Sequence, residues 1–338
     1  MAVSIRDVAR AAGVSVGTVS RAFNGYSDIK DETKRMILAT AKELGYVPNL
    51  NAKILAAKNQ RIMAVILAGF MADRGLTDEL VIKMLRGASS YAIAHNLELA
   101  AYILSSEQQQ EKSFEQFCRE HSLSGAMCFG VKTTDAYYED LKKSKIPCVT
   151  VDVLVEGENM GYVGTDNAAA SEEIAKLVLR RNHKRIVFLN GRREATVCTE
   201  RLAGMERALK LYGLKLEANL YTDFRANQAE EMVTEYIMEN GTEKATAFIC
   251  ASDLVALGAA KAIRRCGYAV GKDFSVTGFD GLHIASLNDP SISTVNQNME
   301  AKGYAAAEML HAIIEGRRVK RQRLIPYTLI ETESIGNY

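Results

Sequence analysis

The stretch that decides the character of the N-terminus is residues 4–25, "SIRDVARAAGVSVGTVSRAFNG". Ser4 can cap a helix with Asp7 as its reciprocal partner, and apolar residues follow at helical spacing. Gly13 interrupts this pattern, and Ser15 can cap a second helix. A third helix is expected at about residues 31–44, because acidic residues begin it and Gly45 follows it. Two short helices joined by a tight turn and completed by a third predict a helix-turn-helix.

The second helix of this stretch has two distinct faces. Its inward stripe consists of Val19 and Phe23. A small helical bundle without a nucleic-acid role would satisfy the same pattern, but a merely solvated face prefers long charged side chains. Short side chains instead allow a helix to enter the major groove of DNA. The outward residues are short or able to hydrogen-bond: Val16, Gly17, Ser20 and Arg21.

Charge is distributed unevenly along the 338 residues. The formal net charge is +1, but residues 1–61 contain ten Lys and Arg against five Asp and Glu, so they carry +5 and the rest carries −4. Such a division favours a nucleic-acid-binding module joined to a second part, although five excess charges alone are more often just a solvated face.

From Ile62 onward apolar strands alternate with amphipathic helices, which predicts doubly wound parallel sheets. The alternation runs to about residue 152 and restarts after Gly164, so two α/β units in tandem are expected, with a cleft between them. A last helix at about residues 299–315 and the strand "YTLIE" must return to these sheets, which predicts that the chain crosses between the lobes more than once. The expected strands are "IMAVILA", "LELAAYIL", "GAMCFG", "IPCVTVD", "RIVFLNG", "LYTDF", "TAFICAS" and "FSVTGFD".

The sequence lacks several common catalytic and nucleotide-binding motifs. The sequence has no phosphate loop, no dinucleotide fingerprint, no HExxH and no GxSxG. The five histidines are dispersed, and the six cysteines lack CxxC spacing and lie largely in apolar runs, which indicates reduced, buried thiols. We therefore expect no catalytic residue, no metal and no cofactor. The absence of a secretory signal and of an apolar run of roughly 20 residues predicts a cytoplasmic protein without a membrane span.

Polar residues stand where the predicted strands end, which is where open parallel sheets bind ligands. Carboxylates accept hydrogen bonds from hydroxyls and a guanidinium donates to them, so such a set suits a polyhydroxylated ligand. Phe224 or Tyr162 could stack on an apolar sugar face. Individual residues of this set have other readings. Each can be a helix cap, for which Asp253 is the best candidate, or a partner in an ordinary salt bridge. The set comprises Asp152, Arg201, Ser252, Asp253 and Asp280.

The chain resembles the LacI/GalR family of transcriptional regulators over essentially its whole length. The resemblance rests on "IRDVARAAGVSVGTVSRAFNG", "AKELGYVPN", "ERLAGM", "ASDLVALG", "VTGFD" and "ISTVNQ", in this order. It implies an all-α helix-turn-helix headpiece at 1–48, a hinge helix or linker at 49–61, and a core at 62–338 like the periplasmic sugar-binding proteins. Within the core it implies an N-lobe of about 62–162 and 291–323 and a C-lobe of about 163–290 and 324–338.

The resemblance also implies how DNA is bound. Family members are homodimers, sometimes tetramers, that bind pseudo-palindromic operators. The implied headpiece contacts are Val16, Gly17 and Arg21 to base edges, and Thr18, Ser20 and Asn24 to phosphates. In the hinge, Leu55 would wedge into the minor groove, with Ala52 and Lys53 beside it. The hinge helix is too short to be stable alone, so it would fold when two copies pack over DNA.

For the small-molecule effector, the resemblance implies seven cleft residues. This chain departs from the family pattern at Ser252, where many sugar-binding members have Asn, which leaves the ligand's identity open. Lys30, Ala64 and Asn182 are further departures that should leave the fold unchanged. Effector contacts from residues 68–80 cannot be placed by matching. The seven residues are Asp152, Tyr162, Arg201, Phe224, Ser252, Asp280 and Gln297.

The sequence thus predicts a ligand-responsive transcription regulator, a repressor, whose operator affinity is changed by a sugar or sugar derivative. Whether the ligand releases or tightens DNA binding is left open. A purine or nucleoside effector and a protein co-regulator remain alternatives within the same class. A transport-type sugar-binding protein and a sugar-processing enzyme are distant alternatives, opposed by the headpiece, the missing signal peptide and the missing phosphate loop.

Overall fold

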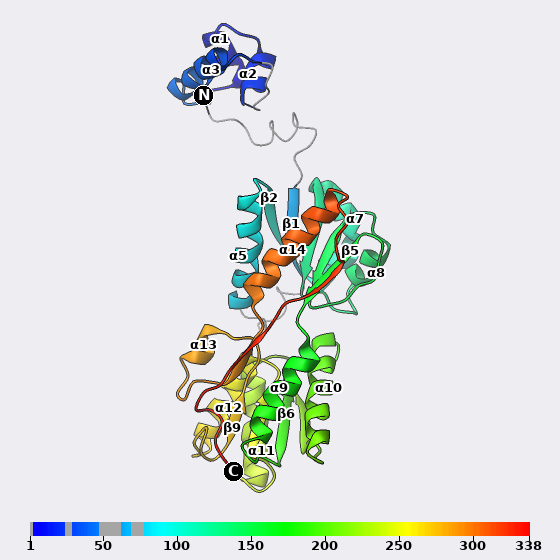
Figure 1. Ribbon diagram of the computed structural model, residues 1–338, viewed down its shortest axis with the longest axis vertical. Coiled ribbons are helices and arrows are strands. Elements are labelled where there is room, and N and C mark those ends of the chain that lie inside the picture. The colour runs from blue at the N-terminus through cyan, green and yellow to red at the C-terminus, as the bar shows by residue number, and fades with distance from the viewer. Residues whose placement is uncertain (1–2, 24–28, 47–61, 69–77) are drawn as a thin grey trace. The chain divides into compact units, whose positions relative to one another are not determined.

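The computed structural model describes residues 3–23, 29–46, 62–68 and 78–338. Its contacts divide the chain into two compact units, Met1–Gln60 and Arg61–Tyr338 (Figure 1). The first unit is much the smaller of the two. Within the described residues, no helix is both long enough and apolar enough to cross a membrane.

The first unit is a three-helix bundle made of α1 (Ile5–Ala11), α2 (Val16–Phe23) and α3 (Asp31–Glu43). Its core takes two residues from each helix, which meet because they recur at helical spacing on one face. Phe23 lies at the edge of this core, with its ring edge-on to Tyr46 at 5.7 Å. The buried residues are Val8, Ala9, Val19, Ala22, Ile37 and Ala41.

The predicted helix caps are confirmed. Ser4 accepts from the Asp7 backbone N–H, and the Asp7 carboxylate accepts from the Ser4 backbone N–H, so α1 begins with a reciprocal capping box. The Thr18 backbone N–H donates to Ser15 Oγ at 3.0 Å at the start of α2. The third helix was expected to end at about residue 44, but α3 ends at Glu43 and Leu44 is its C-cap, 39% exposed.

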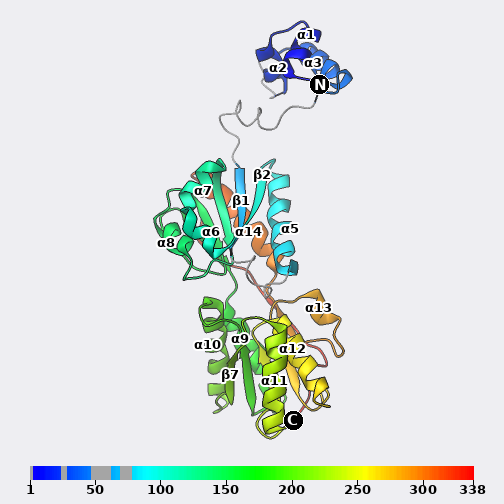
Figure 2. The same cartoon turned by 180° about the vertical axis from the view of Figure 1, so that it is seen from behind.

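The second unit consists of two α/β lobes. The first lobe has a parallel six-stranded sheet in the order β11-β5-β4-β3-β1-β2. One face is covered by α5 (Asp78–Ala94) and α14 (Met299–Ile314), and the other by α6 (Ser106–Glu111), α7 (Phe114–Glu120) and α8 (Ala136–Lys143) (Figures 1 and 2). Its strands are β1 (Ile62–Ala68), β2 (Glu98–Leu104), β3 (Leu123–Phe129), β4 (Cys148–Val151), β5 (Met160–Gly164) and β11 (Gln322–Leu324).

The second lobe has a parallel four-stranded sheet in the order β7-β6-β8-β9. Helices α9 (Asn167–Leu179) and α10 (Thr196–Leu211) cover one face, and α11 (Ala226–Asn240) and α12 (Asp253–Arg265) cover the other. Its strands are β6 (Ile186–Asn190), β7 (Ala218–Tyr221), β8 (Ala247–Cys250) and β9 (Ser275–Thr277). The predicted doubly wound architecture is therefore confirmed in both lobes.

The chain crosses between the lobes after β5, between β10 (Thr294–Asn296) and α14, and after β11. The last crossing runs through β12 (Thr328–Ile330), which pairs antiparallel with β10. It ends at Ser334, whose carbonyl accepts from the Val276 backbone N–H in the second lobe. The expectation of several crossings is confirmed, and these segments connect the two lobes.

Some elements differ from their predictions. One helix was expected between β2 and β3, but α6 and α7 are separate because Ser105 and Ser113 each cap a new helix start. β5, β10, β11 and α13 (His283–Ser286) were not predicted. The three strands have three to five residues, and α13 has four, so none carries a measurable period.

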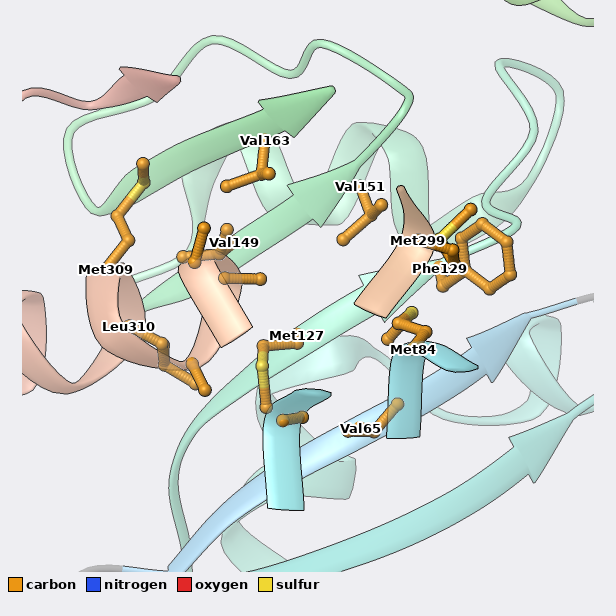
Figure 3. Packing of buried hydrophobic residues seen from close by; sticks show 14 of the residues in the cluster. Val65, Met84, Met127, Phe129, Val149, Val151, Val163, Met299, Met309 and Leu310 are labelled. Carbon is orange, nitrogen blue, oxygen red and sulfur yellow. The ribbon is translucent and has the colours of Figure 1, made fainter. Parts of the chain in front are cut away.

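The buried cluster of the first lobe shows how the last helix is tied to the first strands. Figure 3 shows Met309 and Leu310 of α14 beside Val149 and its neighbours on the sheet. Close approach to α5 is possible because two glycines face the partner backbone. A Cβ on Gly87 would lie 1.9 Å from the Glu300 carbonyl oxygen, and one on Gly303 would lie 2.1 Å from that of Met84. Tight packing here places the N-terminus of α14 against the cleft.

Candidate functional site

The exposed face of α2 is the candidate nucleic-acid surface. Val16 is 42% exposed, Gly17 and Arg21 are exposed, and Thr18 and Ser20 are half-buried. The Ser15 hydroxyl lies 2.8 Å from Thr18 Oγ1, which orders the start of the helix. Because the exposed residues Val16 and Gly17 have short or absent side chains, the helix backbone can approach a groove closely.

Four of the predicted DNA contacts lie outside the described residues. They are Asn24 at the end of α2 and the hinge residues Ala52, Lys53 and Leu55. The hinge helix over 49–61 lies outside them as well.

The second unit contains a cleft of about 1070 Å³, including the part open to solvent. Both lobes line it: Phe129 and Val151 come from the first lobe, and Phe224 and Ser252 from the second. Much of the lining is apolar, as in small-molecule sites where a few polar groups fix orientation. The charged and amide residues in the lining are Lys132, Asp152, Arg192, Glu194, Arg201, Asp280 and Gln297.

A chain of hydrogen bonds links two carboxylates of the lining through a buried lysine. Lys302 Nζ donates to Asp152 Oδ1 at 2.6 Å and to Gln297 Oε1 at 2.5 Å. Gln297 Nε2 donates to Asp280 Oδ1 at 2.7 Å. Asp152 follows β4, Gln297 follows β10, and Asp280 follows β9, so strand ends of both lobes meet here.

Arg201 projects from α10 and is only 4% exposed. Its Nε donates to Asn167 Oδ1 at 2.9 Å and its Nη1 to the Ala251 carbonyl at 2.5 Å. The guanidinium lies 3.7 Å from the centre of the Phe279 ring. These contacts fix the Arg201 guanidinium in place. Its remaining N–H groups can donate to a ligand hydroxyl or carbonyl.

Burial shapes the electrostatics of these groups. It raises the pKa of Asp280, which Arg201 lowers in turn. Burial lowers the pKa of Lys302, and Asp152 opposes this by pairing with it. Across the described residues, no three His, Cys, Asp or Glu side chains converge as a metal site would require.

Two protein families match separate parts of the chain. Residues 4–49 match the bacterial regulatory proteins of the lacI family, and residues 175–335 match the periplasmic binding protein-like domain. The HTH-type transcriptional regulator RegA of Clostridium saccharobutylicum is 28% identical over 338 residues, covering 99% of each chain. The chain thus combines a LacI-family helix-turn-helix domain with a periplasmic-binding-protein-like domain.

Solved structures agree with this pair of domains at the level of the fold. The lac repressor dimer bound to operator and an anti-inducer has a TM-score of 0.86 at 23% identity, covering 99% of each chain. The transcriptional regulator CelR in complex with cellobiose has a TM-score of 0.73 at 24% identity, covering 98% of this chain and 99% of that chain. The predicted family, the helix-turn-helix and the binding-protein-like core are therefore confirmed.

The cleft brings together six of the seven residues that the resemblance to the LacI/GalR family implies for effector binding. These are Asp152, Arg201, Phe224, Ser252, Asp280 and Gln297. Tyr162 is the seventh and is not among the lining residues. Its ring folds back over Gly164, where a Cβ would lie 2.1 Å from the Tyr162 hydroxyl oxygen. Phe224 packs over Gly191 in the same way, but it still faces the cleft.

Asp253 differs from its prediction as a helix cap. Ser252 is the N-cap of α12, and its Oγ accepts from the Val255 backbone N–H at 3.3 Å. Asp253 is fully buried and accepts instead from the Leu282 backbone N–H at 2.7 Å and from Thr294 Oγ1 at 2.5 Å. It therefore joins α12 to the crossing strand β10.

Sequence reasoning missed Lys302 and the polar residues after β3 and β6. The second group could have been found, because Lys132, Thr133, Arg192 and Glu194 also follow the carboxyl ends of parallel strands. Lys302 had a weaker signal. It occupies the apolar stripe of α14 that continues through Ala306, Met309 and Ile313, where a lysine is unexpected.

Proposed function

We propose that this chain is a repressor that binds a pseudo-palindromic operator as a homodimer, and that a sugar or sugar derivative in the cleft changes its operator affinity. The observation that carries the proposal is one chain that combines a helix-turn-helix with a cleft lined by Asp152, Arg201 and Asp280. A DNA-reading element alone or a binding cleft alone would support a simpler role. Their combination supports a ligand-controlled switch.

The proposed DNA contacts follow the exposed face of α2. Arg21 donates to a guanine, Val16 contacts a thymine methyl group, and Gly17 allows close approach to base edges. Thr18, Ser20 and Asn24 hold phosphates. In the hinge, Leu55 enters the minor groove, flanked by Ala52 and Lys53. We assign the headpiece to 1–48, the hinge to 49–61 and the core to 62–338.

Exposed apolar side chains support self-association. Ile82 of α5, Ile103 of β2 and Leu287 next to α13 are 53%, 50% and 70% exposed. Isologous dimers bury such surfaces symmetrically. Two headpieces held by one dimer then match the two-fold symmetry of a pseudo-palindrome.

The effector proposal rests on Asp152, Arg201, Phe224 and Asp280 in the cleft lining. Carboxylate oxygens and a fixed guanidinium are complementary to vicinal hydroxyls, and the Phe224 ring offers an apolar face. Tyr162, which packs over Gly164, would join the site only if its ring turned toward the cleft. The relative RegA is a transcription regulator. We place the action of this chain in the cytoplasm, where DNA is accessible.

The DNA half of the proposal is tested by selection from a random-sequence duplex library with the purified full chain. We expect enrichment of a two-fold-symmetric sequence with affinity that falls as salt rises, because phosphate contacts release counterions. Recovery of no symmetric sequence would contradict operator recognition by a dimer.

The ligand half is tested by melting the protein with neutral sugars, sugar phosphates and nucleosides. A ligand that binds only the folded state raises the melting temperature. We expect a carbohydrate to do so and to change the affinity for the selected duplex. A response confined to nucleosides would replace the sugar by the purine class of effector.

A further inference from the structure

Two features of its position disfavour a charged Lys302, namely burial and the nearby helix dipole. Its side chain has no exposed surface, and it is the fourth residue of α14, where the positive end of the helix dipole lies. A buried ammonium needs a partner carboxylate and hydrogen-bond acceptors to remain charged. A lysine at this position therefore requires a dedicated environment, and the cleft provides it.

The environment consists of two residues that themselves line the cleft. Asp152 Oδ1 and Gln297 Oε1 accept from Lys302 Nζ, at 2.6 and 2.5 Å. An ammonium can only donate, so it determines which end of the Gln297 amide turns toward it. The amide nitrogen then points to Asp280 Oδ1 at 2.7 Å. Lys302 is not in the lining, and it acts on a ligand only through these neighbours.

The arrangement determines what the two carboxylates can still bind. One oxygen of Asp152 is taken by Lys302, and one oxygen of Asp280 by Gln297. The second oxygen of each carboxylate can accept from a hydroxyl. A ligand ammonium would have to compete with Lys302 for Asp152, and Arg201 in the same lining would repel it.

We propose that Lys302 is a positioning residue of the effector site that sets its ligand class, so that the part of the cleft lined by Asp152, Arg201 and Asp280 accepts an uncharged, hydroxyl-bearing group and rejects a cationic amine. The inference rests on the proposed function, since it narrows the carbohydrate class to sugars that place no charged amine against these three residues. It assigns a specificity role to a residue that makes no contact with the ligand.

The test compares matched probes on the full chain by thermal melting and calorimetry. D-glucose and D-galactose are paired with D-glucosamine and D-galactosamine, and cellobiose and maltose extend the neutral set. The measurements are made at about pH 6, where an amine of this kind is protonated. We expect the Kd of the wild type for a neutral sugar to be at least tenfold lower than its Kd for the amino counterpart.

The deciding variant is Lys302→Met, which keeps the length of the side chain and removes its charge. We expect at least tenfold weaker binding of the neutral probe and a shift of preference toward the amino sugar, because Asp152 loses its partner. Asp152→Asn combined with Lys302→Met removes both charges and should restore the neutral preference. Lys176→Met is the matched control, since Lys176 pairs with Glu172 at 2.5 Å on α9 and is absent from the cleft lining.

The outcomes separate the two proposals. A wild type that prefers the amino sugar, or a folded Lys302→Met variant whose preference is unchanged, overturns the role of Lys302 while leaving a sugar-responsive regulator intact. A wild type that binds no carbohydrate overturns the proposed effector class and this inference with it. A preference shift in the Lys176→Met control would assign the effect to general destabilisation and would also overturn the role.

Discussion

Arg201 owes its position in the cleft to partners on three different elements. Asn167 begins α9, Ala251 follows β8, and Phe279 follows β9. All three belong to the second lobe, so the guanidinium is fixed before any ligand arrives. Preorganisation of this kind reduces the entropy lost on binding.

The first prediction concerns the division of labour between cleft and headpiece. Arg201→Ala should abolish the response to the effector while leaving affinity for the selected operator nearly unchanged, because α2 lies in a separate unit. Operator affinity is measured by fluorescence anisotropy with and without ligand. Arg193→Ala is the control, since Arg193 stacks on Tyr221 and is absent from the cleft lining. Equal loss of both functions in a folded Arg201→Ala protein would contradict separate sites.

His183 predicts a pH dependence of stability. It is buried against Thr246, Ser275, the Gly336 carbonyl and the Tyr338 ring. Burial lowers its pKa from 6.5 to about 4, and the charge of Arg185 adds to this. Because the folded pKa lies below the unfolded one, the stabilisation is fully present above pH 6.5. This contribution to the free energy of unfolding is lost as pH falls toward 4. The loss is up to about 3 kcal/mol, because a pKa difference of 1 corresponds to about 1.4 kcal/mol.

Urea unfolding at several pH values measures this effect. His183→Asn should be less stable than the wild type at pH 7, because hydrogen bonds change, but its stability should fall less steeply between pH 6.5 and 4. Parallel slopes for the two proteins would show that His183 titrates normally in the fold.

At the scale of elements, helices pack in pairs through glycine. A Cβ on Gly204 of α10 would lie 2.0 Å from the Ala168 carbonyl oxygen on α9, and one on Gly258 of α12 would lie 2.1 Å from that of Ala226 on α11. The two contacts repeat on the two faces of the same sheet. Backbones can approach this closely only where no side chain intervenes.

The next prediction follows from this contact. An alanine in a helix normally stabilises by about 1 kcal/mol relative to glycine. Gly204→Ala should instead destabilise by about 1–3 kcal/mol, since α9 and α10 must separate. Chemical denaturation of the isolated variant measures the change. Gly17→Ala is the control, because the nearest atom to its Cβ is 3.7 Å away. A Gly204→Ala protein as stable as the wild type would show that the helix pair adjusts freely.

The helices and strands also differ in how well the sequence predicts them. Long strands such as β1 and helices such as α5 were predictable because their apolar period is sustained. β5 was missed because its five residues include two glycines and are defined by pairing with β4 and β11. Periodicity contains no information on such non-local pairing.

The candidate site shows the same limit. Asp152 and Asp280 could be expected at the cleft because each ends a predicted strand. The bridge through Lys302 could not, because Lys302 follows Asp152 by 150 residues in the sequence and α14 reaches the cleft through its glycine contact with α5. A single lysine in the apolar stripe of α14 is unusual in the sequence, but only the fold identifies Asp152 as its partner.

At the scale of the whole molecule, the two units are coupled only if a ligand in the cleft and DNA on the headpiece each change the other's affinity. Linkage makes this coupling reciprocal. If the effector changes operator affinity by some factor, the operator must change effector affinity by the same factor, which is about 5- to 150-fold in typical cases.

The final prediction uses this reciprocity. Calorimetry gives the Kd of the effector for the free protein and for the protein saturated with the selected duplex, and anisotropy gives the Kd of the duplex with and without saturating effector. We expect the two ratios to agree within experimental error. A scrambled duplex of equal length is the control and should leave the effector Kd nearly unchanged, since non-specific contacts do not require the same dimer geometry. If saturating effector leaves the Kd of the selected duplex unchanged, and the duplex leaves the Kd of the effector unchanged, the cleft and the headpiece are not coupled and the proposed mechanism is wrong.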